Sequence, residues 1–445
     1  MTTHRSLDPV WGSRCCGLIA SASAGLRRLT IALVTTCCVS QVALCQKALT
    51  WPEVRSRFEA TNPILQAGRI GIDESRADEI TAGLRPNPEF TFTSDGFQLI
   101  PYAGHWLPLA GLDKSPGVSQ LIERQHKREL RRDSALEATT IATSELADQE
   151  RNLLFNLRAA FVQTLQEKAI LALARQNLAY YDQVLRVSRD RKQAGDISQV
   201  DLDRLELQRV QYETDLETAK VNLRTAKIQL LTLLNERTPV EQFDVTGPYD
   251  FPDQIASLDE LRKVALDTRP DLRAALQSVE KAKTDHRLAW ANGSADPVIS
   301  AWYTRNPSFN NPYDFNTVGA SVSIPIRIFD KNQGEKARTA LEITRAQRLR
   351  DATQAQVFGD VDSAYAAIES NLALLRTYKA NYLQRAAQVR DTLWFAYQNG
   401  GASLLDFLQA QQDYRSVRLN YLNLIGSYLT TAAQLNMAVG QEVVQ

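Results

Sequence analysis

The chain has 445 residues, enough for two or three ordinary domains, and its 51 Lys and Arg residues balance its 51 Asp and Glu residues. This balance gives no reason to expect a nucleic-acid partner. The four histidines are scattered and there are only two methionines, so no metal site within one chain and no other cofactor is predicted. Neither a Ser/His/Asp set nor a GxxxxGK[ST] nucleotide loop is present, and we therefore predict that the protein is not an enzyme.

The N-terminus, residues 1–45, is predicted to be an export signal peptide. Arg27 and Arg28 precede the apolar run LTIALVTTCCVSQVAL, which leads into the small-residue ending ALCQ. All five cysteines lie in this segment, so cleavage before Gln46 would leave a mature chain without cysteine. Two alternatives stay open: an uncleaved anchor helix, for which the run is short, and a lipoprotein acylated at Cys45.

Residues 46–236 are predicted to form the first of two repeats. It opens with a short helix pair, continues with strands at about 86–122, and ends in a long helical hairpin at about 123–236. Neither Pro nor Gly occurs between Glu123 and Lys192. About 65 helical residues would reach ~100 Å, which is longer than a small globular domain is wide. We therefore expect extended hairpins.

Residues 257–440 are predicted to repeat this layout after a proline-rich linker at 237–256. The strands are expected at about 296–328 and the second long hairpin at about 330–438. The segment TVGASVSI alternates apolar and polar residues, which is typical of a half-exposed strand. Beyond residue 46 no stretch is apolar enough for a transmembrane helix, so any part that spans a membrane must be β-structure.

Two stretches 205 residues apart, QAGDISQVDLDRL and QNGGASLLDFLQA, carry the same helix-start pattern. In each, a glycine suits the left-handed residue that ends one helix, a serine suits the N-cap of the next, and an aspartate suits its third position. After each serine, apolar residues follow steps of three and four for about five heptads, which indicates a coiled coil. Each stretch is therefore predicted to be a tight turn between two long antiparallel helices. The shared positions are Gly195, Ser198 and Asp201 in the first turn and Gly400, Ser403 and Asp406 in the second.

An ordered set of segments resembles the TolC-type outer-membrane efflux family, also called outer-membrane factors. The segments are AGLRPNPEFTF at 82–92, SVSIPIRIFDKNQGEKARTA at 321–340, and the turn pattern at Gly400, Ser403 and Asp406. PNPE and FDKNQGE are most similar to the branch that serves heavy-metal and cation efflux pumps. The resemblance implies a mainly α fold with a small β part, in which duplicated long coiled-coil hairpins form a trimeric α-barrel. Because four strands cannot close a barrel alone, it also implies a shared twelve-stranded transmembrane β-barrel with four strands from each chain.

The resemblance further implies a homotrimeric, passive duct in the cell outer membrane with its helical part in the periplasm. Its partners would be a periplasmic adaptor (membrane fusion) protein and an inner-membrane pump of the RND type, and metal cations are a candidate cargo. The six turn residues would form the periplasmic aperture and contact the adaptor. Asp406 would supply an acid ring there, while Gln409 stands where some members have a second acid and Ala402 where some have a gate-locking arginine.

The main alternative is a periplasmic coiled-coil scaffold or adaptor protein without a channel. Such a scaffold would account for the heptads. It would not account for the export signal, the alternating strands and the full duplication together.

Overall fold

The computed structural model describes residues 48–101, 104–109, 111–252, 254–306 and 315–444. The predicted signal peptide and the choice between Cys45 and Gln46 lie outside the described residues. Within the described residues, none of the helices is both long enough and apolar enough to pass through a membrane. The elements in chain order are α2 (Trp51–Thr61), α3 (Pro63–Gly83), β1 (Glu89–Asp95), β2 (Asp113–Leu121), α4 (Lys127–Ala194), α5 (Gln199–Leu233), η1 (Val240–Gln242), α6 (Leu258–Thr268), α7 (Pro270–Asn292), β3 (Val298–Asn306), β4 (Phe315–Ser323), α8 (Gln333–Thr377), η2 (Tyr378–Tyr382), α9 (Leu383–Gln398) and α10 (Leu404–Val439).

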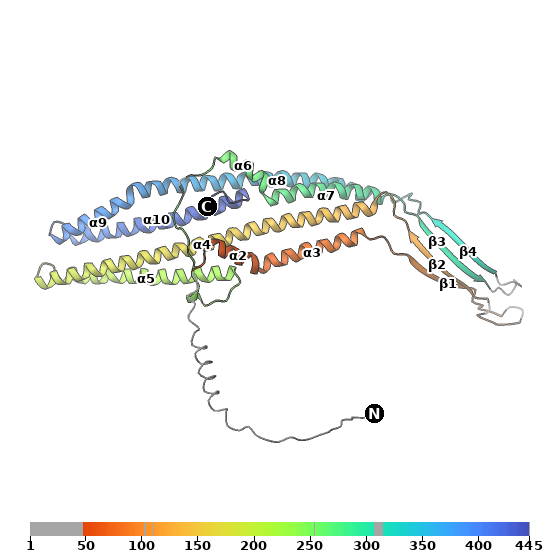
Figure 1. The fold of residues 1–445 in the computed structure, drawn as a ribbon, viewed down its shortest axis with the longest axis horizontal. Helices are drawn as coiled ribbons and strands as arrows, with labels where there is room; N and C mark the ends of the chain where they lie inside the picture. The colour runs from red at the N-terminus through yellow and green to blue at the C-terminus, as the bar shows by residue number, and fades with distance from the viewer. Residues whose placement is uncertain (1–47, 102–103, 110, 253, 307–314, 445) are drawn as a thin grey trace, which may run out of the picture. The chain divides into compact units, whose positions relative to one another are not determined.

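Long helices dominate the part of the chain from Leu49 onward, and the sheet is small. Figure 1 shows the sheet beyond one end of α4, α7 and α8, and the α4–α5 and α9–α10 turns at the opposite end. Helix α4 alone has 68 residues and packs against α3, α5, α7 and α10. At 1.5 Å per residue it is about 100 Å long. The predicted mainly α fold with a small β part is confirmed.

The four strands form one antiparallel sheet in the order β1-β2-β3-β4. Strands β2 and β3 pair although they are far apart in the sequence, with Val118 opposite Ala301, so the sheet joins the two halves of the chain. Strands β1 and β4 are its outer strands, and each pairs on one side only within the described sheet. Unpaired N–H and C=O groups at such edges favour pairing with another strand.

The apolar core is divided into separate clusters because helices of this length form arms and cannot surround one centre. One cluster lies where α6, α8 and α10 meet and includes Ile368 and Tyr428. A second joins α2, α4 and the end of α5 around Phe58 and Leu230. A third lies behind the two hairpin turns.

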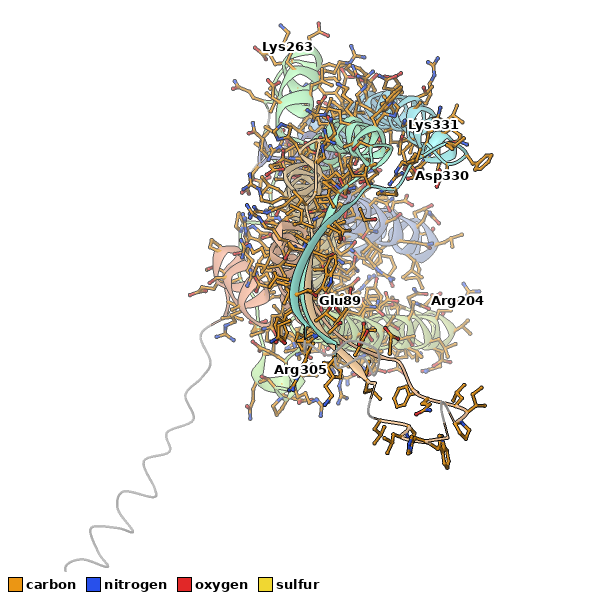
Figure 2. The ribbon with its side chains drawn as sticks, turned by 90° about the vertical axis from the view of Figure 1, so that its right-hand side faces the viewer. Glu89, Arg204, Lys263, Arg305, Asp330 and Lys331 are labelled. Atoms are coloured by element: carbon orange, nitrogen blue, oxygen red, sulfur yellow. The ribbon has the colours of Figure 1, made fainter. Side chains whose placement is uncertain are left out.

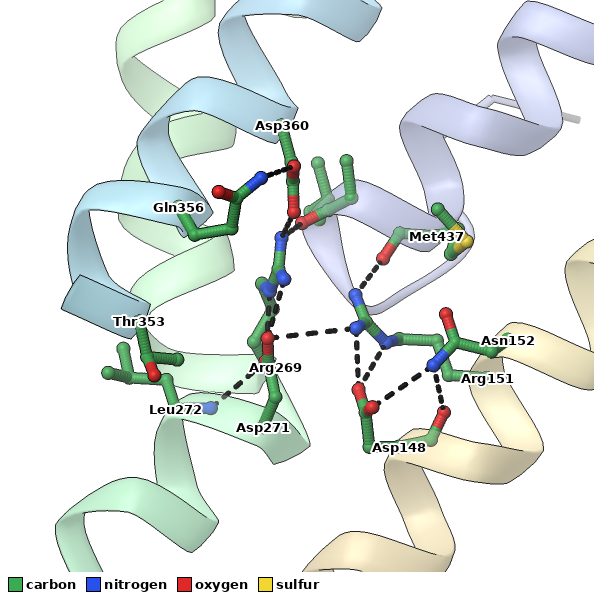
Figure 3. Close-up of polar contacts among 12 residues, drawn as sticks. Asp148, Arg151, Asn152, Arg269, Asp271, Leu272, Thr353, Gln356, Asp360 and Met437 are labelled. Atoms are coloured by element: carbon green, nitrogen blue, oxygen red, sulfur yellow. Dashed lines mark hydrogen bonds and ion pairs between the residues drawn. The ribbon is translucent and has the colours of Figure 1, made fainter. Parts of the chain in front are cut away.

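Polar contacts hold the junction where α4, α7, α8 and α10 meet (Figure 3). The Arg269 side chain is only 3% exposed, and it donates to Asp271 and Asp360 at 2.6 and 2.8 Å and to the carbonyl of Ala438 at 3.1 Å. Arg151 on α4 donates to Asp148 and lies 3.8 Å from Asp271. Arg151 also donates to the carbonyl of Met437 at 2.5 Å, so a charged hydrogen bond links α4 to α10 and an ion pair links α4 to α7.

The second long hairpin differs from a continuous helix in one place. A π-helical turn at Tyr378–Tyr382 separates α8 from α9, although no Pro or Gly lies there. The rings of Tyr378 and Tyr382 meet edge to face at 5.3 Å, and the Lys379 ammonium lies 4.9 Å from the centre of the Phe251 ring. We attribute the extra residue in this turn to these contacts, because the wider turn places Lys379 against Phe251 in the segment between α5 and α6.

Candidate functional site

The first hairpin turn has the local structure that its sequence predicts. Gly195 has a left-handed φ of +87° and its N–H donates to the carbonyl of Lys192 at 3.1 Å, which ends α4. Ser198 begins α5, where its hydroxyl accepts from the N–H of Asp201 at 3.1 Å and donates to the Asp201 carboxylate at 2.8 Å. The charge of Asp201 thus lies in the first helical turn, where the helix dipole favours an acid.

The second turn repeats this structure. Gly400 has a φ of +75°, and Ser403 begins α10. The Asp406 carboxylate accepts from the Ser403 hydroxyl at 2.7 Å and from the Ser403 N–H at 3.2 Å, so Ser403 and Asp406 form a full capping box. Asp406 is exposed to solvent nonetheless. Its place in an aperture ring stays a prediction, as does the contact of both turns with an adaptor.

An aromatic cluster fills the space behind both turns. The Tyr397 ring stacks on Phe407 with centroids 5.8 Å apart, and the Tyr181 ring stacks on Tyr212 at 4.4 Å. Burial raises the pKa of Tyr181, whose hydroxyl donates to the carbonyl of Leu205. Because the cluster draws on α4, α5, α9 and α10, it positions both turns together.

Two arginines beside the aromatic cluster connect the hairpins to each other, and the sequence analysis missed both. The guanidinium of Arg191, in the last turn of α4, donates to the carbonyl of Tyr397 at 3.2 Å and lies 5.0 Å from the centre of that ring. Burial raises the pKa of the Tyr397 phenol, although Arg191 opposes the shift. Arg390 on α9 lies between two rings, 4.0 Å from the centre of Tyr414 and 4.9 Å from that of Tyr180. Such cation–π contacts are worth roughly 0.5–2 kcal/mol each.

A groove of about 860 Å³ lies between α4, α5 and α10 and is lined mainly by amides, hydroxyls and a few charges. Arg415 on α10 pairs with Asp215 on α5, and its guanidinium lies 4.3 Å from the centre of the Tyr212 ring. Glu167 on α4 lines the same groove with 7% exposure. Burial raises the pKa of the Glu167 carboxyl, although hydrogen bonds from Gln163 and Asn222 act to lower it. In the described parts of the chain, no group of three or more His, Cys, Asp or Glu residues could hold a metal ion.

The remaining predicted positions also lie near the second turn. Gln409 donates to Asp413 at 2.9 Å and adds no charge of its own. Ala402 is partly buried against the aromatic cluster. The arginines that link the two hairpins are therefore Arg191, Arg390 and Arg415, at positions other than 402.

Comparisons with known proteins agree with this architecture. The family model "Outer membrane efflux protein" matches residues 261–441. The cobalt-zinc-cadmium resistance protein CzcC of Cupriavidus metallidurans is 24% identical over 407 residues, which cover 88% of this chain and 90% of CzcC. The pyoverdine export outer membrane protein OpmQ of Pseudomonas aeruginosa is 25% identical over 320 residues, which cover 69% of this chain and 65% of OpmQ.

The second half of the chain thus matches the outer membrane efflux protein family.

Solved structures agree on the fold of this efflux protein. The outer-membrane channel CusC superimposes with a TM-score of 0.72 at 16% identity, covering 87% of this chain and 91% of CusC. VceC of Vibrio cholerae superimposes with a TM-score of 0.68 at 14% identity, covering 87% of this chain and 95% of VceC. The resemblance to the heavy-metal branch is supported by CzcC and CusC, and the family consists of channel proteins and not of enzymes. The protein is accordingly placed in the outer membrane, with its helical part in the periplasm.

Proposed function

We propose that this protein is the outer-membrane component of a tripartite efflux system and acts as a passive, trimeric duct. The observation that carries the proposal is the four-stranded sheet at the end of the long arms. One face of this sheet exposes large apolar side chains, among them Phe90, Val118 and Val318, and both outer strands are free to pair with further strands. Three copies would supply twelve strands, and closing them into one barrel would cover every edge and give lipid the apolar face.

The proposal includes the division of the chain. Residues 1–45 would be removed as a signal peptide. Residues 46–236 and 257–440 would form two repeats that occupy equivalent sectors around the axis of the trimer, joined by a linker at 237–256. The equal construction of the two hairpin turns supports this arrangement.

The partners would be a periplasmic adaptor and an inner-membrane pump of the RND type. The exposed turns that contain Gly195, Ser198, Asp201, Gly400, Ser403 and Asp406 would meet the adaptor, since they form the end of the molecule that lies farthest from the sheet. Metal cations are the proposed cargo, because the similar protein CzcC is a cobalt-zinc-cadmium resistance protein.

Three copies of Asp406 would place three carboxylates around the aperture, where they would attract cations. In planar bilayers, Asp406→Ala should weaken the block of current by multivalent cations. Ser403→Ala is the matched control, because it removes the hydroxyl that bonds the same carboxylate and keeps the charge. If block is unchanged in Asp406→Ala, or if Ser403→Ala weakens it equally, Asp406 acts only as a helix cap.

The proposal as a whole is tested by fractionation and sizing. The mature protein should sediment with outer membranes, run as a heat-sensitive trimer after mild detergent extraction, and conduct ions in planar bilayers. A folded, water-soluble monomer without conductance would favour the periplasmic scaffold instead.

A further inference from the structure

The register of the sheet separates its residues into two faces of different character. Residues directly opposite each other share a face, so the pairs Thr91–Gly117, Gly117–Trp302 and Trp302–Gly319 assign all four strands. One face is apolar. The other, which we call the polar face, consists mostly of small and hydroxyl-bearing residues. On that face lie Glu89, Thr91, Thr93, Asp95, Asp113, Ser115, Gly117, Ser119, Leu121, Val298, Ser300, Trp302, Thr304, Thr317, Gly319, Ser321 and Ser323.

The charges in the four strands divide between these faces by sign. The polar face holds the acids Glu89, Asp95 and Asp113 and, within the described strands, no Lys or Arg. The apolar face holds the bases Lys114 and Arg305, which lie directly opposite each other on the neighbouring strands β2 and β3. Glu89 and Arg305 are labelled in Figure 2. A surface with acids alone attracts cations and repels anions.

Trp302 is a large aromatic residue on the polar face. Its neighbours on both sides are glycines, Gly117 on β2 and Gly319 on β4. A Cβ atom at position 319 would come within 2.5 Å of the indole carbons Cε2 and Cζ2, and one at 117 within 3.1 Å of the Trp302 Cβ. The indole therefore lies across Gly319 in space that only glycine leaves open. The side chain nevertheless remains 37% exposed.

The height of Trp302 in the sheet places it between acids. Gly117 on β2 lies opposite both Trp302 on β3 and Thr91 on β1, so Thr91 and Trp302 are at the same position along the sheet. On β1, Glu89 lies two residues from Thr91 toward the helices, and Asp95 lies four residues from Thr91 toward the loops. At about 3.3 Å per residue these offsets are roughly 7 and 13 Å along the strand, and β1 lies two strands from β3, roughly 10 Å across the sheet. A cation moving along the polar face would pass one acid, the indole and a second acid in turn.

We propose that the polar face of the sheet lines the exit of the duct and that the Trp302 indole, whose level in the sheet lies between those of Glu89 and Asp95, is a binding site there for organic cations. This inference rests on the proposed function, because only a closed trimer turns the polar face into a lumen. The acids concentrate cations at the exit, and the flat ring face binds those with weakly hydrated, apolar surfaces, such as quaternary ammonium ions. The site is separate from Asp406, which lies at the opposite end of the helices.

Block of single trimers by tetrapropylammonium tests the inference, with the ion added on the side of the sheet. Trp302→Leu keeps an apolar side chain over Gly319 and removes the aromatic ring, so block should weaken about three- to tenfold, the effect of one cation–π contact. Trp302→Phe should retain most of the block. A double variant that neutralises both acids, Glu89→Gln with Asp95→Asn, should also weaken block and should lower the preference for K⁺ over Cl⁻.

Tyr303→Leu is the matched control, since Tyr303 is the adjacent aromatic residue and points to the apolar face. It should leave block unchanged. Each variant is first shown to form the heat-sensitive trimer. Equal block in wild type and Trp302→Leu, or equal weakening in Tyr303→Leu, would overturn the inference while leaving the duct intact. A wild-type protein that forms no conducting trimer would contradict the proposed function itself.

Discussion

The buried Arg269 offers a sharp test of what holds the junction of α7, α8 and α10 together. We predict that Arg269→Met lowers the free energy of unfolding far more than Arg262→Met does. Both arginines connect the region of α6 to α8, Arg269 through Asp360 and Arg262 through a bidentate pair with Asp362 at 2.8 Å. They differ in burial, because the Arg269 side chain is 3% exposed and that of Arg262 is 35% exposed.

The expected magnitudes follow from that difference. Removing one partner of a buried ion pair costs about 3–5 kcal/mol, because the other charge is left uncompensated. Asp271 and Asp360 keep some contact with water, at 24% and 30% exposure, so we expect the low end of that range, about 3 kcal/mol. The exposed pair of Arg262 should contribute far less, because solvent screens it.

Urea unfolding of the detergent-solubilised protein, followed by its helical circular dichroism, measures both losses under the same conditions. The two variants remove the same charge and nearly the same side-chain volume, so the difference between them reports the burial of Arg269 and its further bonds to Asp271 and the Ala438 carbonyl. Equal losses for Arg269→Met and Arg262→Met would refute the reasoning, and so would a loss below about 1 kcal/mol for Arg269→Met.

Two further predictions concern a backbone position and a pKa. Gly195→Ala should destabilise the protein by about 1–2 kcal/mol, because the φ of Gly195 is +87°. Gly359→Ala should instead stabilise it by about 0.5–1 kcal/mol, because position 359 lies inside α8 and has open space for an added Cβ. Thermal melts of the two variants measure both effects. Burial alone would raise the pKa of Asp271, but its bonds to Arg269 outweigh this and lower it. The stability that this pair supplies is therefore present above about pH 4 and lost as pH falls further, so melting temperature should drop more steeply from pH 6 to 3 in wild type than in Asp271→Asn.

The parts of the fold predicted from the sequence are those set by nearby residues. The cap of α10 needs only Ser403 and Asp406, three positions apart, and the end of α4 needs only Gly195. Heptad spacing fixes the arms in the same local way. Such signals are readable in a single sequence because every group involved lies within one or two helical turns.

The contacts missed by the sequence analysis depend on the packing of distant segments. Arg191 meets Tyr397 across 206 positions, and nothing near either residue marks the partner. Trp302 lies over Gly319 because β3 and β4 pair in one register, and a shift by one residue would turn the ring to the other face. The π-helical turn at Tyr378–Tyr382 also lacks a local signal, since no Pro or Gly interrupts the helix there.

The mass of the purified, mature protein in mild detergent, determined by light scattering with the bound detergent subtracted, tests the central claim most directly. Pairing of the free edges of β1 and β4 between copies predicts the mass of three chains, falling to that of one chain on heating. A fully folded particle with the mass of a single chain would contradict the account.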